Sequence, residues 1–293
     1  MEADPIAAAL AGAGDTTPLR SRTPVGGGSI SQALRLETTQ GAYLLKTGVR
    51  GLPGFYRAEA RGLELLRAAG AVRIPLVLAC RDEEGGAPGL ILLEWLEQPS
   101  GARRDAAAEA LGPALAVLHG SRADAYGLDH DNYIGATPQP NGWSASWLEF
   151  FRERRLGFQI ERASTAGLLD QARRRALARL LDRLERWIDD RLVQPALLHG
   201  DLWSGNMIIG PGGAPALIDP AVSYGDREAD LAFTALFGGF PERFYRAYGE
   251  AWPLAPGWQE RRDLYNLYHL LNHLNLFGPG YLPSVDAVVQ KYV

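Results

Sequence analysis

The sequence predicts an α+β protein of two lobes, a small antiparallel β-rich lobe followed by a larger, mainly helical lobe. Short stretches with strand-like patterning, separated by turn signals, dominate the chain up to about residue 94. Long stretches with apolar residues at helical spacing dominate after the segment "EQPSGAR". Because the character changes between these two regions, we expect the first lobe to span residues 1–96 and the second 97–293.

The elements of the first lobe follow in order. Residues 1–20 predict a short helix and a linker, and "SISQALRLET" and "AYLLKTG" predict strands separated by the turn "TTQG". The segment "GFYRAEARGLELLRAAG" predicts an amphipathic helix that ends at Gly70. The segment "RIPLVLACRDEEGGAPGLILLEWLE" predicts two strands joined by an acidic, glycine-rich turn.

The second lobe begins with a predicted helix in "DAAAEALGPALAVLHG", capped by Gly120. Two further helices are predicted in "WSASWLEFFRERRLGFQIERA" and "LLDQARRRALARLLDRLERWIDDRL". Two short strands follow, one from "LLHG" to "NMIIG" and one in "APALID", joined by the turn "PGG". The last predicted helices contain "DREADLAFTALFGG", "PERFYRAYGEAW" and "RRDLYNLYHLLNHLNLFG".

Composition indicates a globular protein, with 46% hydrophobic and 22% charged residues. A net charge of −4 predicts no general affinity for nucleic acid or for an anionic membrane, and no run of about 18 apolar residues predicts a membrane span. The arginine-rich segment 152–191 is explained better by a solvated helix face than by nucleic-acid contact. A single cysteine, Cys80, excludes an internal disulfide and favours a reducing compartment, so we expect a cytoplasmic protein.

Lysine is rare in this chain, since only Lys46 and Lys291 among the 30 basic residues are lysines. Lys291 lies near the end of the chain, whereas Lys46 lies in the predicted strand "AYLLKTG". A lone lysine there indicates a position that needs a compact ammonium rather than a forked guanidinium. Chance is an equally good explanation of this observation when it is taken alone.

The segment "LLHGDLWSGNMII" raises the main functional question, because a polar turn, a metal site and a catalytic loop would all suit it. His199 and Asp201 are followed by Asn206, five residues after the aspartate, and a predicted strand then leads to Asp219. This spacing matches the protein-kinase pattern H-x-D-x-x-x-x-N with a later metal-binding aspartate. In that interpretation Asp201 is the base that orients the attacking hydroxyl, and Asn206 and Asp219 supply oxygen ligands to Mg²⁺.

Three features earlier in the chain complete the kinase pattern in the expected order. The loop "VGGGS" contains Gly26, Gly27, Gly28 and Ser29, whose backbone amides would approach the phosphates of ATP. Lys46 on the following strand would reach the α- and β-phosphates, and Glu59 on the next helix would orient it. The sequence therefore predicts a protein-kinase-like fold that uses ATP and Mg²⁺.

Two other functions could use the same residues. A metal hydrolase would use His199 with Asp201 and the pair His269 and His273, but "HLLNH" lacks the glutamate of the zincin helix motif. We therefore expect His269 and His273 in the core or a pocket wall, and His199 as a scaffold of its loop. A non-catalytic nucleotide-binding module is disfavoured because all five chemical residues are present.

The motifs "LLHGDLWSGN", "LIDPAVSYGDREADLAFTALFGGFPERFYRAYGEAWPL" and "YNLYHLLNHLNLFGPGYL" resemble the fructosamine kinase (ketosamine 3-kinase) family, which has an aminoglycoside-phosphotransferase-like fold. The resemblance implies ATP-dependent phosphorylation of the 3-hydroxyl of a ketosamine, either a small molecule or a glycated protein. The 3-phosphate then destabilises the adduct and releases the amine, which is deglycation repair. A small-molecule kinase of the aminoglycoside or choline type remains the alternative, and the preferred sugar and the oligomeric state stay open.

The resemblance also implies roles for residues outside the kinase pattern. The adenine-binding hinge would be formed by Glu94, Trp95 and Leu96. Three residues are candidates for substrate contact. Trp203 would cover the sugar, and Asp226 would bind the cationic amine. Asn132 would line the entrance or form an Asx turn. Asp230 is expected to hold the catalytic loop by capping backbone groups.

Overall fold

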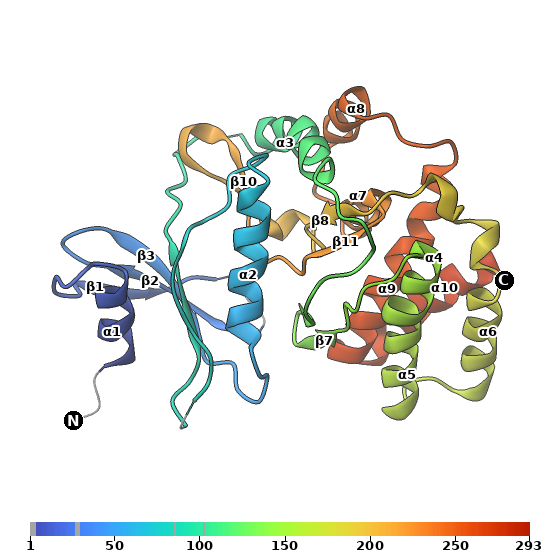
Figure 1. Cartoon of the computed structure of the whole chain (residues 1–293), viewed down its shortest axis with the longest axis horizontal. Coiled ribbons are helices and arrows are strands. Elements are labelled where there is room, and N and C mark those ends of the chain that lie inside the picture. The colour runs from blue at the N-terminus through green and yellow to red at the C-terminus, as the bar shows by residue number, and fades with distance from the viewer. Residues whose placement is uncertain (1–3, 27–29, 85, 102) are drawn as a thin grey trace.

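A five-stranded antiparallel sheet forms the first lobe in the computed structural model, which describes residues 4–26, 30–84, 86–101 and 103–293. The strand order is β1-β2-β3-β5-β4, and the sheet lies at one end of the elongated molecule (Figure 1). Its strands are β1 (Ser21–Pro24), β2 (Gln32–Glu37), β3 (Ala42–Thr47), β4 (Val77–Arg81) and β5 (Leu90–Glu94). The five strands and their order along the chain confirm the β-rich first lobe.

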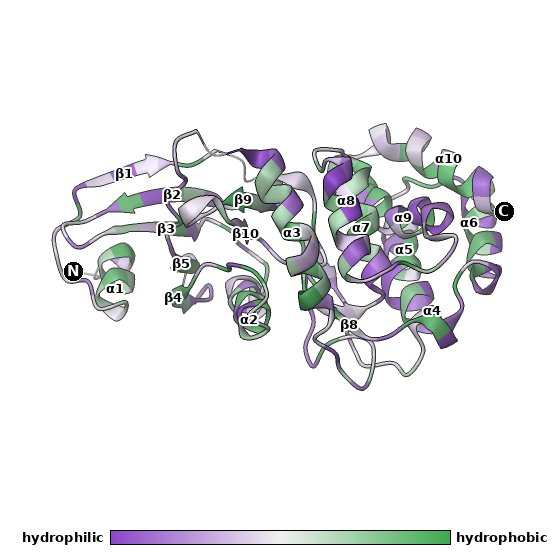
Figure 2. Ribbon diagram, turned by 90° about the horizontal axis from the view of Figure 1, so that it is seen from above, coloured by the Kyte–Doolittle hydropathy of each residue, from purple (hydrophilic) through white to green (hydrophobic). Residues whose placement is uncertain are grey.

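The interior strand β5, between β3 and β4, is buried on both faces, which explains its unbroken apolar sequence "LILL". Because side chains alternate along a strand, Leu90 and Leu92 pack with helix α1 (Pro5–Gly12), whereas Ile91 and Leu93 pack on the other face. That second face is covered by helix α2 (Phe55–Ala68). Figure 2 shows the hydrophobic residues of the central strands and of these helices.

Helix α2 brings an acidic residue to the sheet. Its buried residues include Tyr56, Leu63 and Leu66, and Glu59 lies in the same stripe by helical spacing. On β3, Leu45 packs on the α1 face, so the neighbouring Lys46 projects toward α2. The alternation of the strand and the periodicity of the helix thus direct Lys46 and Glu59 toward each other.

The second lobe is mainly helical and fills the other end of the molecule (Figure 1). Its α-helices are α3 (Arg104–His119), α4 (Trp147–Phe150), α5 (Phe158–Thr165), α6 (Gln171–Leu181), α7 (Arg227–Leu236), α8 (Glu242–Ala251), α9 (Trp258–Phe277) and α10 (Leu282–Tyr292). No helix in the described part of the chain is long and apolar enough to cross a membrane.

Two predicted helices differ from the observed ones. The segment from Trp147 to Thr165 is not one α-helix, because π-helical η1 (Phe151–Gly157) separates α4 from α5. The helix predicted to run to Leu192 ends at Leu181, and the 3₁₀ turns η2 (Leu184–Arg186) and η3 (Asp190–Leu192) follow. Beyond that end, the carboxylate of Asp190 accepts hydrogen bonds at the start of α4, from Leu148 N and the hydroxyl of Ser146.

Three short strand pairs lie in the second lobe. The predicted hairpin is present, with β9 (Met207–Ile209) and β10 (Pro215–Leu217) joined through "PGG". The other pairs are β8 (Ala196–Leu198) with β11 (Ser223–Gly225), and β6 (Asn132–Ile134) with β7 (Thr137–Gln139).

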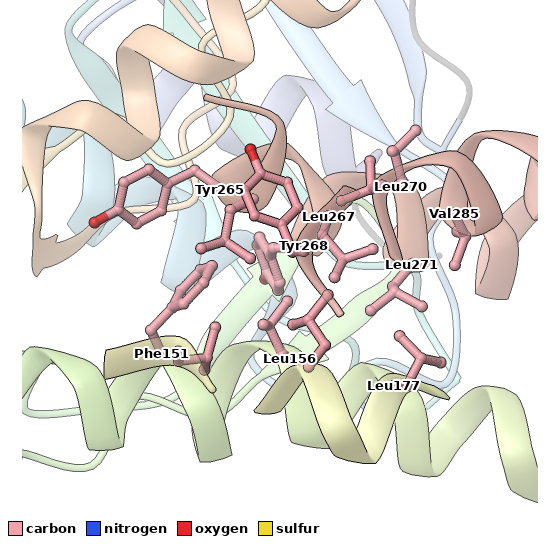
Figure 3. Close-up of a cluster of buried hydrophobic side chains, with 14 of the residues drawn as sticks. Phe151, Leu156, Leu177, Tyr265, Leu267, Tyr268, Leu270, Leu271 and Val285 are labelled. Atoms are coloured by element: carbon pink, nitrogen blue, oxygen red, sulfur yellow. The ribbon is translucent and has the colours of Figure 1, made fainter. Parts of the chain in front are cut away.

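Two large apolar clusters hold the second lobe together. One spans both lobes, since residues of α2 and β5 pack with residues of α3, α8 and the β8–β10 region. The other joins η1 and α6 to α9 and α10, and Figure 3 shows Phe151, Leu156, Leu177 and residues of α9 converging in it. The β8–β10 region, which contains the kinase-like motif, is therefore anchored to the sheet lobe by the first cluster.

Helices α3 and α8 approach each other at Gly112. A Cβ atom there would lie 2.8 Å from both Phe244 O and Tyr248 N. We expect Gly112→Ala to lower the free energy of unfolding by about 1–3 kcal/mol, because a backbone contact cannot yield to a methyl group. Gly249→Ala on α8 is the matched control, since a Cβ there meets open space and alanine favours a helix. Equal urea-denaturation midpoints for the two variants would contradict the close approach.

Candidate active site

The predicted pair of Lys46 and Glu59 forms across the sheet, with 2.7 Å between Lys46 Nζ and Glu59 Oε1. Lys46 Nζ also contacts the carboxylate of Asp219, which follows β10. Burial disfavours the charged lysine, but the carboxylates of Asp219 and Glu59 outweigh it and raise the pKa of Lys46. A buried, permanently charged ammonium therefore links the sheet, α2 and the second lobe.

His199 supports the loop from within the protein. Its side chain is fully buried, with Nε2 3.0 Å from Ile218 O and Nδ1 accepting a hydrogen bond from Asp201 N at 3.2 Å. Burial lowers the pKa of His199, so the neutral ring donates from Nε2 and accepts at Nδ1. This agrees with the expected scaffold role and leaves neither ring nitrogen free for a metal.

Asp230 fixes the same loop from α7. Its carboxylate accepts hydrogen bonds from His199 N at 2.7 Å and Gly200 N at 2.9 Å. Burial opposes ionisation, but these bonds and the contact with His119 keep the pKa of Asp230 below its usual value. Gly200 has φ +80°, and a Cβ there would lie 2.0 Å from Ala221 O, so only glycine suits this position.

Asp201, Asn206 and Asp219 converge beside this loop. Asn206 Nδ2 donates to Asp201 Oδ2 at 3.0 Å and to Asp201 O at 2.8 Å. Asp219 has φ 56°, a conformation that a residue with a side chain rarely adopts outside constrained sites. Burial, followed by the charge of Asp219, raises the pKa of Asp201 to about 7.

This donor set suits a hard divalent cation. Because Asn206 Nδ2 is used by Asp201, its Oδ1 is the atom left for a ligand, and Asp219 supplies a carboxylate. Carboxylate and amide oxygens are the protein ligands that Mg²⁺ takes, usually with waters and substrate phosphates. A cation here would also relieve the repulsion between Asp201 and Asp219.

A cavity of about 380 Å³ contains these groups, a size within the range of small-molecule sites. The predicted residues that line it are Lys46, Glu59, Asp201, Asn206, Asp219, Trp203 and Asn132. Ile30 and Ser31 also line it, next to the glycine-rich loop. Of that loop, Gly26 is exposed, and Gly27, Gly28 and Ser29 lie outside the described residues.

Comparison with known proteins agrees with this geometry. The family model for fructosamine kinase matches residues 3–293. The chain belongs to the fructosamine kinase family. It is 43% identical to the probable ketoamine kinase of Synechocystis, over 93% of this chain and 90% of the relative. It is 37% identical to the chloroplastic protein-ribulosamine 3-kinase of Arabidopsis thaliana, over 100% of this chain and 89% of the relative.

Solved structures similar to this chain include a member of the same family and a more distant protein that shares the fold. A Thermobifida fusca protein assigned as a fructosamine-3-kinase superposes with a TM-score of 0.86 at 32% identity, covering 98% of this chain and 97% of the other. Aminoglycoside phosphotransferase APH(4)-Ia, in a complex with AMP-PNP and hygromycin B, gives a TM-score of 0.65 at 17% identity, covering 99% of both chains. These neighbours confirm the predicted kinase-like α+β fold.

The predicted adenine-binding hinge lies apart from the cavity. Glu94 ends β5, and Trp95 and Leu96 follow it, but none of the three is among the described residues that line the cavity, so their hinge role stays a prediction. The carboxylate of Glu94 instead contacts Arg73 and accepts a hydrogen bond from Leu76 N at 3.1 Å.

The proposed amine contact of Asp226 is not supported by its position. Asp226 is buried outside the cavity, where it caps α7 through Glu228 N and accepts a 2.5 Å hydrogen bond from Tyr265 Oη. The sequence is misleading here because an N-cap aspartate and a ligand-binding aspartate both favour a polar loop before a helix.

Asn132 lines the cavity, but its amide is already used within the protein. Nδ2 donates to Val222 O at 2.9 Å, and Oδ1 accepts from Gln139 Nε2 at 2.8 Å and Asn141 Nδ2 at 2.7 Å. Gln139 Nε2 also contacts Ala221 O at 3.1 Å. This network positions the segment after Asp219 and replaces the predicted Asx turn.

Sequence reasoning missed this network and part of the cavity wall. Gln139 is held by a 2.6 Å hydrogen bond from Tyr268 Oη, and Arg155 of η1 donates to Asn141 Oδ1 at 2.7 Å. Phe237, Phe277 and Tyr281 line the cavity with His273, which agrees with the expected pocket-wall position of that histidine. No local pattern marks these residues, because their neighbours come from distant parts of the chain.

We expect Asp230→Ala to lower the free energy of unfolding by about 2–5 kcal/mol, because two buried N–H groups lose their acceptor. Urea denaturation measures this loss. Asp263→Ala is the matched control, since Asp263 pairs with Lys291 on the surface and should contribute less than about 1 kcal/mol. Similar losses in the two variants would show that Asp230 does not hold the loop.

Proposed function

We propose that this chain transfers the γ-phosphoryl group of Mg-ATP to the 3-hydroxyl of a ketosamine. The observation that carries the proposal is the convergence of Lys46, Glu59, Asp201, Asn206 and Asp219 in one cavity. Membership of the fructosamine kinase family supports a ketosamine as the acceptor. The relative named protein-ribulosamine 3-kinase supports the 3-position, and the fold neighbour that holds AMP-PNP supports ATP.

Each residue has a task that follows from its surroundings. Asp201 orients the attacking hydroxyl and accepts its proton, while Asn206 keeps the carboxylate aligned through the 3.0 Å hydrogen bond. Lys46 positions phosphate oxygens and is itself held by Glu59. Asn206 Oδ1 and Asp219 would hold Mg²⁺, which when bound neutralises the charge that develops on the transferred phosphoryl group.

The product suggests a role in repair. Phosphorylation at the 3-position makes the sugar adduct unstable, so the amine is released and glycation is reversed. We propose this deglycation, on small amines or on proteins, as the purpose of the reaction. The alternative is an aminoglycoside or choline type of acceptor, since APH(4)-Ia and the choline kinase LicA share the fold.

One substrate panel decides between these functions. ADP release is measured with fructosamine, ribulosamine and erythrulosamine adducts, an aminoglycoside and choline, each with and without Mg²⁺. The proposal predicts Mg²⁺-dependent turnover of at least one ketosamine, with the phosphate at C3 by NMR of the product. Turnover of the aminoglycoside or choline alone would refute it, and ATP binding by calorimetry without any turnover would indicate a binding module.

Asp201→Asn tests the base. We expect kcat to fall by about 10²- to 10⁴-fold, because the amide cannot accept the proton, while ATP binding by calorimetry changes little. Asp124→Asn is the matched control, since Asp124 is exposed and outside the cavity. A near-normal kcat for Asp201→Asn would make the base assignment wrong.

Lys46→Arg tests the need for an ammonium. Because Lys46 is buried between two carboxylates, a guanidinium would displace the phosphate oxygens, and we expect kcat/KM for ATP to fall by about 10²-fold. Lys291→Arg is the matched control, because it changes the other lysine at an exposed ion pair with Asp263. Equal kinetic constants for the two variants would show that position 46 does not require an ammonium group.

A further inference from the structure

The amine-bearing end of the substrate has no assigned binding site once Asp226 is excluded, and the inference here rests on the proposed function. The sugar hydroxyl must reach Asp201, so the amine extends along the rest of the cavity wall. The lining includes other aromatic residues such as Phe55, Tyr133 and Trp203, and it includes Phe237, His273, Phe277 and Tyr281, which we call the aromatic rim. Phe237 is 46% exposed and Phe277 is 54% exposed, so the rim faces solvent.

The aromatic rim is a continuous, preformed surface. Ring centroids are 5.0 Å apart for Phe237 and His273, 5.5 Å for His273 and Phe277, and 5.1 Å for His273 and Tyr281. His273 Nδ1 lies 2.7 Å from His269 O, which fixes the central ring and leaves Nε2 as its acceptor. Burial lowers the pKa of His273, so this ring is uncharged at neutral pH.

The aromatic rim itself carries no charged side chain. Among the described lining residues, the charged side chains are Lys46, Glu59, Asp201 and Asp219. Lys46 contacts Glu59 and Asp219, and Asp201 is bound by Asn206. The described wall therefore supplies neither a further carboxylate to pair with an ammonium nor a further cation to pair with a carboxylate.

A contiguous exposed apolar patch, unlike a single exposed ring, marks a site of interaction. The amine of a ketosamine is a secondary ammonium, and aromatic faces attract such cations. An alkyl or aryl group on the amine would gain apolar contact with the same rings. A carboxylate next to the amine would instead lose water without gaining a cationic partner, which is unfavourable.

We propose that the aromatic rim binds the amine-bearing end of the ketosamine and selects for amines that carry an alkyl or aryl group. It disfavours amines that carry an adjacent carboxylate. Phe237 and Phe277 are the specificity-determining residues, because they are the most exposed members of the rim.

Three adducts of one sugar test this selection: fructose joined to butylamine, to benzylamine and to glycine. We expect kcat/KM of the wild-type protein to be about 10-fold higher for the butylamine and benzylamine adducts than for the glycine adduct. The difference lies in KM, since the aromatic rim touches no reacting atom.

Variants of the aromatic rim then measure how much its rings contribute to binding the amine-bearing end of the substrate. Phe237→Ala and Phe277→Ala should raise KM for the benzylamine adduct about 3- to 10-fold and leave KM for ATP unchanged. Trp143→Ala is the matched control, because Trp143 is 49% exposed but does not line the cavity. Phe277→Lys supplies the missing cation and should improve kcat/KM for the glycine adduct relative to the benzylamine adduct.

These experiments distinguish a failure of the proposed role of the aromatic rim from a failure of the proposed function. Equal kcat/KM for the three adducts, or unchanged KM values in both alanine variants, would overturn the role of the aromatic rim while ketosamine phosphorylation stands. No turnover of any adduct by the wild-type protein would overturn the proposed function and the rim with it.

Discussion

Lys46 is a buried charge, and the site is arranged around the two carboxylates that surround it. An isolated ammonium in the interior would cost several kcal/mol, so it persists only with partners. Glu59 comes from α2, and Asp219 comes from the segment after β10 in the other lobe. Removing Lys46 would leave the Glu59 carboxylate buried without its cation and would break the link to Asp219, so the position of the sheet relative to the catalytic loop depends on this lysine.

Asp219 also needs support from its own lobe, because its left-handed backbone is unfavourable by about 1–3 kcal/mol. The segment that follows it is held on two sides. Ala221 N donates to His199 O at 2.9 Å, and the carbonyls of Ala221 and Val222 accept from Gln139 and Asn132. The β6–β7 hairpin thus acts as a brace for this segment. Hydrogen bonds from Asn132 and Gln139, which have no chemical role in the proposed function, hold Asp219 in its strained conformation.

The sequence predicts which polar residues meet in one cavity, but it does not predict the residues that support them. In the proposed function Asp201, Asn206 and Asp219 serve one reaction, whose demands would fix their order and spacing, so they can be predicted from a single chain. Lys46 and Glu59 follow from the periods of a strand and a helix. Asp226 is a case in which the sequence pattern is misleading, because an N-cap aspartate and a ligand-binding aspartate look alike in a sequence.

The capping role of Asp226, the brace from Gln139 and the aromatic rim all depend on contacts between distant segments. A π-helical turn such as η1 has no sequence signal, yet Arg155 within it supports Asn141 and so the brace. Local patterns therefore predict the groups that meet in the cavity, and tertiary packing decides which residues hold those groups in place.

The two sides of the cavity differ in how they are constrained. Asp201 and Asn206 lie on a loop whose backbone is bound by Asp230 and His199, and a 1 Å shift there would disturb the alignment that phosphoryl transfer requires. The exposed rings of Phe237 and Phe277, at the ends of α7 and α9, carry no such network. Substitutions on that side change contact area without moving the loop. In the proposed function, the fold would therefore let the acceptor's amine group vary while the reacting hydroxyl keeps its position.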